Sequence, residues 1–415
     1  MTPFLEFIFL LAVLLMLAKL AGYISVRLGQ PSVLGELIAG LLIGPSLLNI
    51  LGLPFQDSHL LEETIAHLAE IGVLLLMFVA GLELHLTELA RNSKVSAYAG
   101  ILGVIFPIGL GYAVGLFFGL GQTSAIFLGL ALGATSVSIS AQTLMELKVL
   151  RSRVGLGLLG AAVFDDILVI LLLSAFLALQ SGDAGLAQIA IIFVRMIIFF
   201  GLSAAFGIWV LPRLVRWVSP KPISQGVLTL ALVIMFVYGI AAELLGGMAA
   251  ITGTFLAGLM FARSPEKERL ERGISSISYG FFVPIFFIHV GMSANLRNLD
   301  PAAGWLLAGM TVVAVLGKLG GAGLGARLAG FTNVESLQLG TGMISRGEVG
   351  LILGSVGLSE GLMSGAEFSA LVGMVIVTTL ITPPLLRYLF HYEASRKVLE
   401  QQETPTNNVE IKEEV

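Results

Sequence analysis

The chain has 415 residues, of which 56% are hydrophobic and only 12% are charged, and its mean hydropathy is +0.96. A soluble protein of this length would not need so much apolar surface, so the composition predicts a polytopic membrane protein. The net charge of -4 is too small to indicate a nucleic-acid partner, and the absence of cysteine excludes disulfides, cysteine-ligated zinc and iron–sulfur clusters. The five histidines lack the spacing of metal ligands, and we expect no cofactor.

The hydropathy pattern predicts an all-α protein with about thirteen membrane spans, because its apolar segments are long enough to cross a bilayer. Their approximate bounds, in chain order, are 4–26, 32–51, 64–85, 96–118, 122–146, 154–180, 186–212, 223–243, 246–262, 273–293, 302–326, 334–358 and 366–390. We expect these spans to form one membrane domain over residues 1–392. Residues 393–415 are polar and carry charges of both signs, which predicts a disordered cytoplasmic tail.

Basic residues are unevenly distributed over the connections between these spans. Lysine and arginine follow the odd-numbered spans, whereas the even-numbered connections carry no base except Arg297, after the tenth span. Because positively charged connections remain in the cytoplasm, we expect the N-terminus outside and the C-terminus inside. An odd number of spans also permits two inverted six-helix repeats on either side of one linking span, a plan found in many secondary transporters.

The most informative polar residues are Asp165 and Asp166, which are adjacent in the apolar segment Ala161–Ile170. A carboxylate at bilayer depth is costly, and two neighbouring carboxylates also repel each other. The pair is therefore tolerable if it holds a cation, a proton or a basic partner. The alternative is a helix end that places both aspartates among the lipid headgroups, which the apolar residues on either side disfavour.

Lys318 lies near the middle of the eleventh span, too deep to extend easily to the membrane surface. Its ammonium group needs a carboxylate, and Asp165 or Asp166 is the obvious candidate. A cation that arrives at the aspartates would then compete with Lys318, which could lose its proton once it is released. The alternative is a lysine turned toward the cytoplasmic end of its span. Adjacent helical residues point about 100° apart, so one aspartate can face Lys318 while the other faces the ion path, and the sequence does not assign these roles.

Two spans have sequences that predict an interruption of the helix within the membrane. The fifth span contains a glycine followed by four hydroxyl residues, including Thr135 and Ser136, which can bond a loosened backbone or ligate a hard cation. The twelfth span contains several glycines together with Arg346 and Glu348. Interrupted helices at matching positions of two repeats indicate a transport site. The alternative is a pair of ordinary small-residue packing helices in which Arg346 and Glu348 satisfy each other.

Five motifs resemble those of the cation:proton antiporter 2 family in their order and spacing. They are Pro31–Ser46 (PSVLGELIAGLLIGPS), Gly81–Leu84 (GLEL), Phe164–Asp166 (FDD), Pro284–Phe287 (PIFF) and Arg346–Glu348 (RGE). The resemblance covers nearly the whole membrane portion. It implies bacterial exchange of sodium or potassium for protons by an elevator-like motion, a mobile core with two crossed and discontinuous helices, and a dimerisation domain.

The same resemblance implies a role for each of these polar residues. Asp166 matches the main ion-binding carboxylate of the family, and Asp165 matches its partner, which pairs with the lysine matched by Lys318. The residues that match the supporting positions on the crossing helices are Thr135, Ser136, Arg346 and Glu348. The ligands that the resemblance implies for a transported Na⁺ are Asp166, Asp165, Thr135 and Ser136.

The resemblance also implies a division of the membrane domain. Scaffold and dimerisation helices would occupy about 1–95 and 186–300, and core or transport helices about 96–180 and 301–392. Potassium-efflux members often have glutamine in place of the first aspartate and a nucleotide-binding tail. This chain has Asp165, and its polar tail is too short for such a domain. It therefore looks more like the sodium/proton members with two aspartates, which are expected to be electrogenic.

These observations predict a secondary antiporter, and not an enzyme, that exchanges Na⁺ for H⁺ across the bacterial inner membrane, with Li⁺ and K⁺ as further candidates. Its partners would be monovalent cations, protons, membrane lipids and a second copy in a homodimer, and its role would lie in pH homeostasis. Two alternatives remain open: a K⁺/H⁺ antiporter, because selectivity depends on cavity size, and a cation channel or ion-sensing membrane protein. The charge of Lys318 argues against a channel, because a fixed positive charge obstructs a cation pore. No membrane-embedded nucleophile–base pair or metal motif indicates an enzyme.

Overall fold

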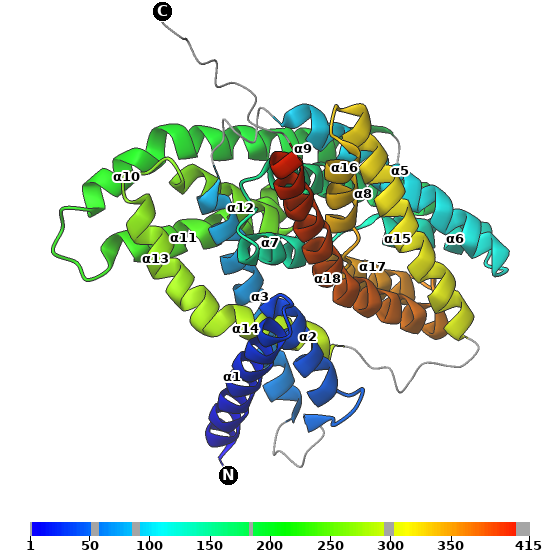
Figure 1. Ribbon diagram of the computed structural model, residues 1–415, viewed down its shortest axis with the longest axis horizontal. Helices are drawn as coiled ribbons and strands as arrows, with labels where there is room; N and C mark the ends of the chain where they lie inside the picture. The colour runs from blue at the N-terminus through cyan, green and yellow to red at the C-terminus, as the bar shows by residue number, and fades with distance from the viewer. Residues whose placement is uncertain (1, 51–57, 85–91, 182–185, 294–302, 404–415) are drawn as a thin grey trace, which may run out of the picture.

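The structure, a computed structural model, describes residues 2–50, 58–84, 92–181, 186–293 and 303–403 (Figure 1). The regular elements in these ranges are all helices, so the prediction of an all-α protein is confirmed. In chain order, with η marking a π-helical turn, they are α1 (Pro3–Arg27), α2 (Ser32–Ile43), α3 (Ser58–Glu83), α5 (Ser93–Phe117), α6 (Gln122–Gly133), α7 (Val137–Glu146), α8 (Arg153–Ser181), α9 (Leu186–Ala205), η2 (Phe206–Val210), α10 (Leu211–Val218), α11 (Gly226–Ala241), η3 (Ala242–Gly246), α12 (Ala250–Phe261), α13 (Lys267–Ile277), η4 (Ser278–Phe282), α14 (Val283–Met292), α15 (Ala303–Leu328), α16 (Asn333–Gly342), α17 (Glu348–Ser359) and α18 (Gly365–Glu403).

Ten helical segments in the described part of the chain are long and apolar enough to cross a membrane. α2 and α12 are shorter apolar helices of 12 residues each, and α16 and α17 form a further, interrupted segment. Many large apolar side chains of α1 and α9 are exposed, as expected for helices that face lipid. The number of thirteen spans and the inverted repeats stay predictions.

Eight helices, α5–α8 and α15–α18, pack together and are called the α5 group below. α5 runs along α15 and also contacts α6 and α8, while α15 contacts α16 and α18. The two long helices touch backbone to backbone, because a Cβ added at Gly321 of α15 would lie 2.3 Å from the carbonyl oxygen of Leu102 in α5. Close approach at small residues is the usual way in which helices associate within a membrane.

The other helices, α1–α3 and α9–α14, are called the α3 group below. α3 packs on α12 and α14, α2 contacts α1 and α14, and α11 packs on α12. In Figure 1, α10, α11 and α13 lie at the left, α5, α6 and α15 lie at the right, and α7 and α12 lie between them. The functional division into scaffold and core helices stays a prediction.

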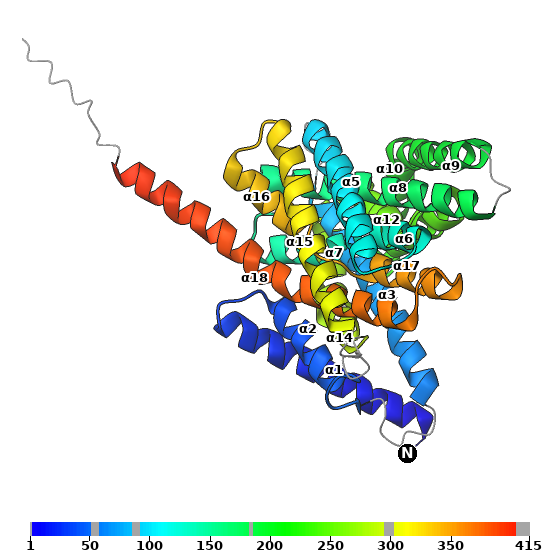
Figure 2. The same ribbon diagram turned by 90° about the vertical axis from the view of Figure 1, so that its right-hand side faces the viewer.

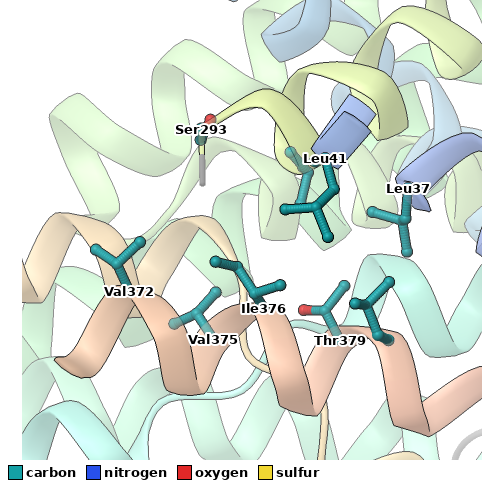
Figure 3. A pocket seen from close by; sticks show the side chains of 10 residues that line it. Leu37, Leu41, Ser293, Val372, Val375, Ile376 and Thr379 are labelled. Atoms are coloured by element: carbon teal, nitrogen blue, oxygen red, sulfur yellow. The ribbon is translucent and has the colours of Figure 1, made fainter. Parts of the chain in front are cut away.

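The two groups meet where α2 and α3 contact α7, where α2 contacts α18, and where α8 contacts α9. A pocket with a volume open to water of about 20 Å³ lies between α2, α14 and α18 (Figure 3). The side chains labelled there are mostly apolar: Leu37, Leu41, Ser293, Val372, Val375, Ile376 and Thr379. A strong polar contact lies elsewhere on the same boundary, where the carboxylate of Glu146 in α7 accepts hydrogen bonds from the backbone N–H (2.6 Å) and the hydroxyl (2.5 Å) of Ser32 in α2.

The last helix is longer than the sequence led us to expect. α18 continues to Glu403, past residue 393, where we predicted that the disordered tail begins, and its end projects away from the other helices in Figure 2. The extension is rich in Glu, Lys, Gln, Leu and Ala, which favour helix and add to an existing helix without a new nucleus. Residues 404–415 of the predicted tail lie outside the described residues.

Candidate functional site

Two helices of the α5 group are interrupted and meet at their breaks. α6 ends at Gly133 and α7 begins at Val137, and α16 ends at Gly342 and α17 begins at Glu348. The two connecting segments pair with each other. The Ser136 N–H donates to the carbonyl oxygen of Ser345 at 2.9 Å, and the Ser345 hydroxyl donates to the Ser136 carbonyl at 2.6 Å. The predicted interruptions of the fifth and twelfth spans are therefore both present, and they cross.

The close approach of the two breaks depends on a residue without a side chain. A Cβ added at Gly347 would lie 2.6 Å from the hydroxyl oxygen of Ser136 and 2.7 Å from its Cβ. Nearby, the Ser140 hydroxyl of α7 donates to the carbonyl oxygen of Gly342 at 2.5 Å. These hydroxyls satisfy backbone groups that the interruption frees, which would otherwise be costly at membrane depth.

Arg346 binds the carboxyl ends of both interrupted helices. Its guanidinium group is fully buried and donates to the carbonyl oxygens of Leu132 near the end of α6 (2.8 Å) and of Met343 and Ile344 after α16 (3.1 Å each). Carboxyl ends of helices carry unpaired carbonyls and partial negative charge, so a cation is favourable there. The sequence left open a pairing between Arg346 and Glu348, whose side chain lies outside the described part of the structure.

Asp165 and Lys318 form a buried ion pair. Asp165 lies on α8 and is 1% exposed, Lys318 lies on α15 and is fully buried, and the Lys318 ammonium group donates to Asp165 Oδ1. The predicted carboxylate partner of Lys318 is therefore present, and it is Asp165. The Thr135 hydroxyl lies near the same carboxylate. Thr135 Oγ1 and Asp165 Oδ2 are both buried.

Asp166 faces in a different direction from Asp165. It is partly buried and lines a small cavity with a volume open to water of about 10 Å³, together with apolar residues of α3, α7, α8 and α12. This volume is on the order of that needed for one water-sized particle. Asp166 Oδ2 accepts a hydrogen bond of 3.0 Å from the hydroxyl of Thr252 in α12. The two adjacent aspartates thus have different surroundings, as their angular separation on a helix predicts.

Two larger cavities lie near this site. One has a volume of about 760 Å³ between α3, α11, η3, α12, α14 and α17, and it shares the lining residue Ile251 with the small Asp166 cavity. The other has a volume of about 370 Å³ and is lined by three carboxylates, Glu36, Glu83 and Glu146, and by Lys19. Among the described residues, this second cavity has no lining residue in common with the Asp166 cavity.

The sequence reasoning missed two contacts of this region. Thr252 was not among the predicted site residues, although the Thr252-Gly253-Thr254 segment places hydroxyls and a glycine inside an apolar span, as the fifth span does. The contact between Glu146 and Ser32 was also missed. Both contacts join the α5 group to the α3 group. They were missed because the sequence pattern of one helix does not indicate which other helices it contacts.

Crossed, discontinuous helices beside buried charges define a membrane ion transporter of the secondary type. Comparison with known proteins gives the family: the model described as "Sodium/hydrogen exchanger, transmembrane" matches residues 12–390. The chain is 43% identical over 385 residues to the Na(+)/H(+)-K(+) antiporter GerN of Bacillus cereus, which covers 93% of this chain and 96% of GerN. It is 45% identical over 388 residues to the probable Na(+)/H(+) antiporter GerT of the same organism, which covers 92% of this chain and 99% of GerT.

The fold is similar to that of the sodium proton antiporter MjNhaP1 from Methanocaldococcus jannaschii, with a TM-score of 0.67, 16% identity, and coverage of 95% of this chain and 99% of MjNhaP1. The chain belongs to the sodium/hydrogen exchanger family and is a membrane cation/proton antiporter. The predictions of an antiporter family and of a transporter instead of an enzyme are confirmed. The roles of the individual site residues stay predictions.

Proposed function

We propose that this protein exchanges Na⁺ for H⁺ and that Asp165, Asp166 and Lys318 carry the exchange. The observation on which the proposal depends is the buried pair of Lys318 with Asp165, next to Asp166 at the crossing of two broken helices. The names of the similar proteins GerN and GerT support sodium and protons as the cargo. Thr135 and Ser136 are proposed to complete the Na⁺ site, with Glu348 and Arg346 supporting it.

The coupling follows from competition for the same carboxylates. In the proton-loaded state, Lys318 is charged and occupies Asp165, as the contact between them supports. A cation that binds at Asp166 and Asp165 displaces Lys318, which then releases its proton. Cation and proton therefore load in turn, and raising the pH favours the cation because protons leave the competing groups. If Lys318 and Asp166 both release protons, more than one proton exchanges for each Na⁺, and transport is electrogenic.

The movement that exposes the site to each side is proposed to be elevator-like, with the α5 group moving against the α3 group. The mostly apolar pocket between α2, α14 and α18 supports such a movement, since apolar contacts are not directional. We further propose the orientation predicted from the basic connections, a homodimer, and residence in a bacterial inner membrane. In this orientation the cavity of about 760 Å³ opens on the outer face and the cavity of about 370 Å³ on the inner face.

Potassium is a second candidate for the transported cation. The name of GerN includes K⁺. The Asp166 cavity is lined by side chains that can move when an ion binds, so its volume does not select between Na⁺ and K⁺. We expect Na⁺ to be preferred and treat K⁺ as an outcome of the experiment.

The test is proton movement in sealed proteoliposomes that contain a pH-sensitive dye, with Na⁺, Li⁺ and K⁺ added in turn. We expect a Na⁺-driven change of internal pH that Asp166→Asn abolishes and that Glu360→Gln, a change at an exposed carboxylate outside the site, retains. A response to K⁺ alone would select the K⁺/H⁺ antiporter. Cation flux under voltage without proton movement would overturn the antiporter in favour of a channel.

A further inference from the structure

Thr252 is a hydroxyl residue that reaches the ion site from outside the α5 group. It lies in the first turn of α12, is 3% exposed, and donates a hydrogen bond of 3.0 Å to Asp166 Oδ2. The other site residues, which are Asp165, Lys318 and the residues of the two broken helices, all belong to the α5 group. The α3 group therefore contributes a polar side chain to the site, through this bond.

We propose that Thr252 is a positioning residue for Asp166 that acts on one face of the membrane only. A hydroxyl that donates to a carboxylate stabilises its ionised form and orients it, and the ionised form is the one that attracts a cation. In the described state the Asp166 cavity shares Ile251 with the cavity of about 760 Å³. Thr252 therefore raises the apparent cation affinity when the site is open to that larger cavity, which is the outer one in the proposed orientation.

The restriction to one face follows from where the two partners lie. Asp166 belongs to α8 of the α5 group, and Thr252 belongs to α12, which packs on α3 and α11 in the α3 group. When one group moves against the other, a hydrogen bond of 3.0 Å between them cannot persist in both end states, because such bonds weaken steeply with distance and angle. This step rests on the proposed exchange function and on the proposed movement.

A matched control lies two residues away on the same helix. Thr254 is fully buried, and its hydroxyl donates to the carbonyl oxygen of Ile251 within α12 at 3.0 Å. Thr→Val keeps the shape of the side chain and removes the hydroxyl. Thr254→Val therefore reproduces the loss of a buried hydroxyl in α12 without touching Asp166, and Thr252→Ser keeps the hydroxyl at the site.

The experiment measures Na⁺/H⁺ exchange in right-side-out and in inverted membrane vesicles, so that the Na⁺ concentration for half-maximal rate (KM) is obtained separately for each face. For Thr252→Val we expect KM to rise about tenfold on one face, the size of effect that follows from losing one hydrogen bond to a charged group. On the other face, KM should stay at the value of the unsubstituted protein. Thr252→Ser and Thr254→Val should leave KM unchanged on both faces.

The outcomes separate this inference from the function on which it rests. If the unsubstituted protein moves no protons in response to any cation, the proposed function fails. If it exchanges cations but Thr252→Val changes KM equally on both faces, or changes only the maximal rate, or behaves like Thr254→Val, the exchange function stands and the role of Thr252 is wrong.

Discussion

Asp165 and Lys318 depend on each other, because each would otherwise be a buried charge without a counter-ion. Asp165 is 1% exposed and Lys318 is fully buried. Removing one partner of such a pair is far more costly than removing both, since the remaining charge is left without compensation. Under the proposed exchange, a cation that displaces Lys318 would take this compensation away from the lysine.

This dependence gives a stability test that is separate from transport. We expect Lys318→Met to destabilise the protein by roughly 3–5 kcal/mol, because Asp165 is left alone in a buried site. The double variant Asp165→Asn/Lys318→Met should recover most of that loss, although it should not transport. Thermal unfolding in detergent at neutral pH measures both effects. Equal melting temperatures for the single and double variants would contradict the interdependence of the two charges.

The need of Lys318 for an aspartate followed from the residues themselves, whereas its assignment to Asp165 came only from the family resemblance. Lysine and aspartate deep in apolar spans require each other, so the pairing was predictable from cost alone. Which aspartate takes the lysine depends on how α8 is rotated against α15, and the sequence of α8 is apolar all round, so it does not report that rotation. The contact of Asp166 with Thr252 likewise depends on the placement of α12.

At the scale of the elements, side-chain and backbone hydrogen bonds hold the two broken helices together at their breaks. Arg346 compensates the carboxyl ends of α6 and α16, and the serines pair the two connecting segments. Glycine and hydroxyl residues were sufficient to predict the breaks, because they weaken a helix and offer alternative hydrogen bonds. That one arginine binds both ends was not predictable, since it requires the crossing itself.

Gly347 offers a test of how closely the breaks must approach. We expect Gly347→Ala to reduce the exchange rate by roughly fivefold or more, because its Cβ would lie 2.6 Å from the Ser136 hydroxyl oxygen and relieving such overpacking costs roughly 1–3 kcal/mol. Gly320→Ala is the matched control, since a Cβ at this exposed position of α15 meets nothing within 4 Å. Exchange rates per molecule in proteoliposomes provide the comparison. Equal rates for the two variants would show that the crossing tolerates separation.

At the scale of the whole molecule, the boundary between the α5 and α3 groups combines an apolar pocket with a few polar contacts. The apolar side chains of α2, α14 and α18 can exchange neighbours at little cost. The bonds from Ser32 to Glu146 are different, because the Glu146 side chain accepts both donors of Ser32 and also accepts a bond of 2.8 Å from Gln142. If the groups move as proposed, these bonds must break in each transport cycle.

The absence of cysteine from the whole sequence makes this movement testable with introduced thiols. Ser32→Cys/Glu146→Cys places one thiol on each group, and a short bifunctional maleimide should join them and stop exchange, because the groups can no longer move apart. Arg153→Cys/Glu335→Cys is the control, because this contact of 3.5 Å joins α8 to α16 within the α5 group. For this variant, the exchange rate after cross-linking should nearly equal the rate before cross-linking. Proton movement before and after cross-linking, with mass spectrometry to verify the linkage, gives the result. Undiminished exchange by fully linked Ser32→Cys/Glu146→Cys protein would mean that α2 and α7 travel together, and the moving boundary would then have to lie elsewhere in the molecule.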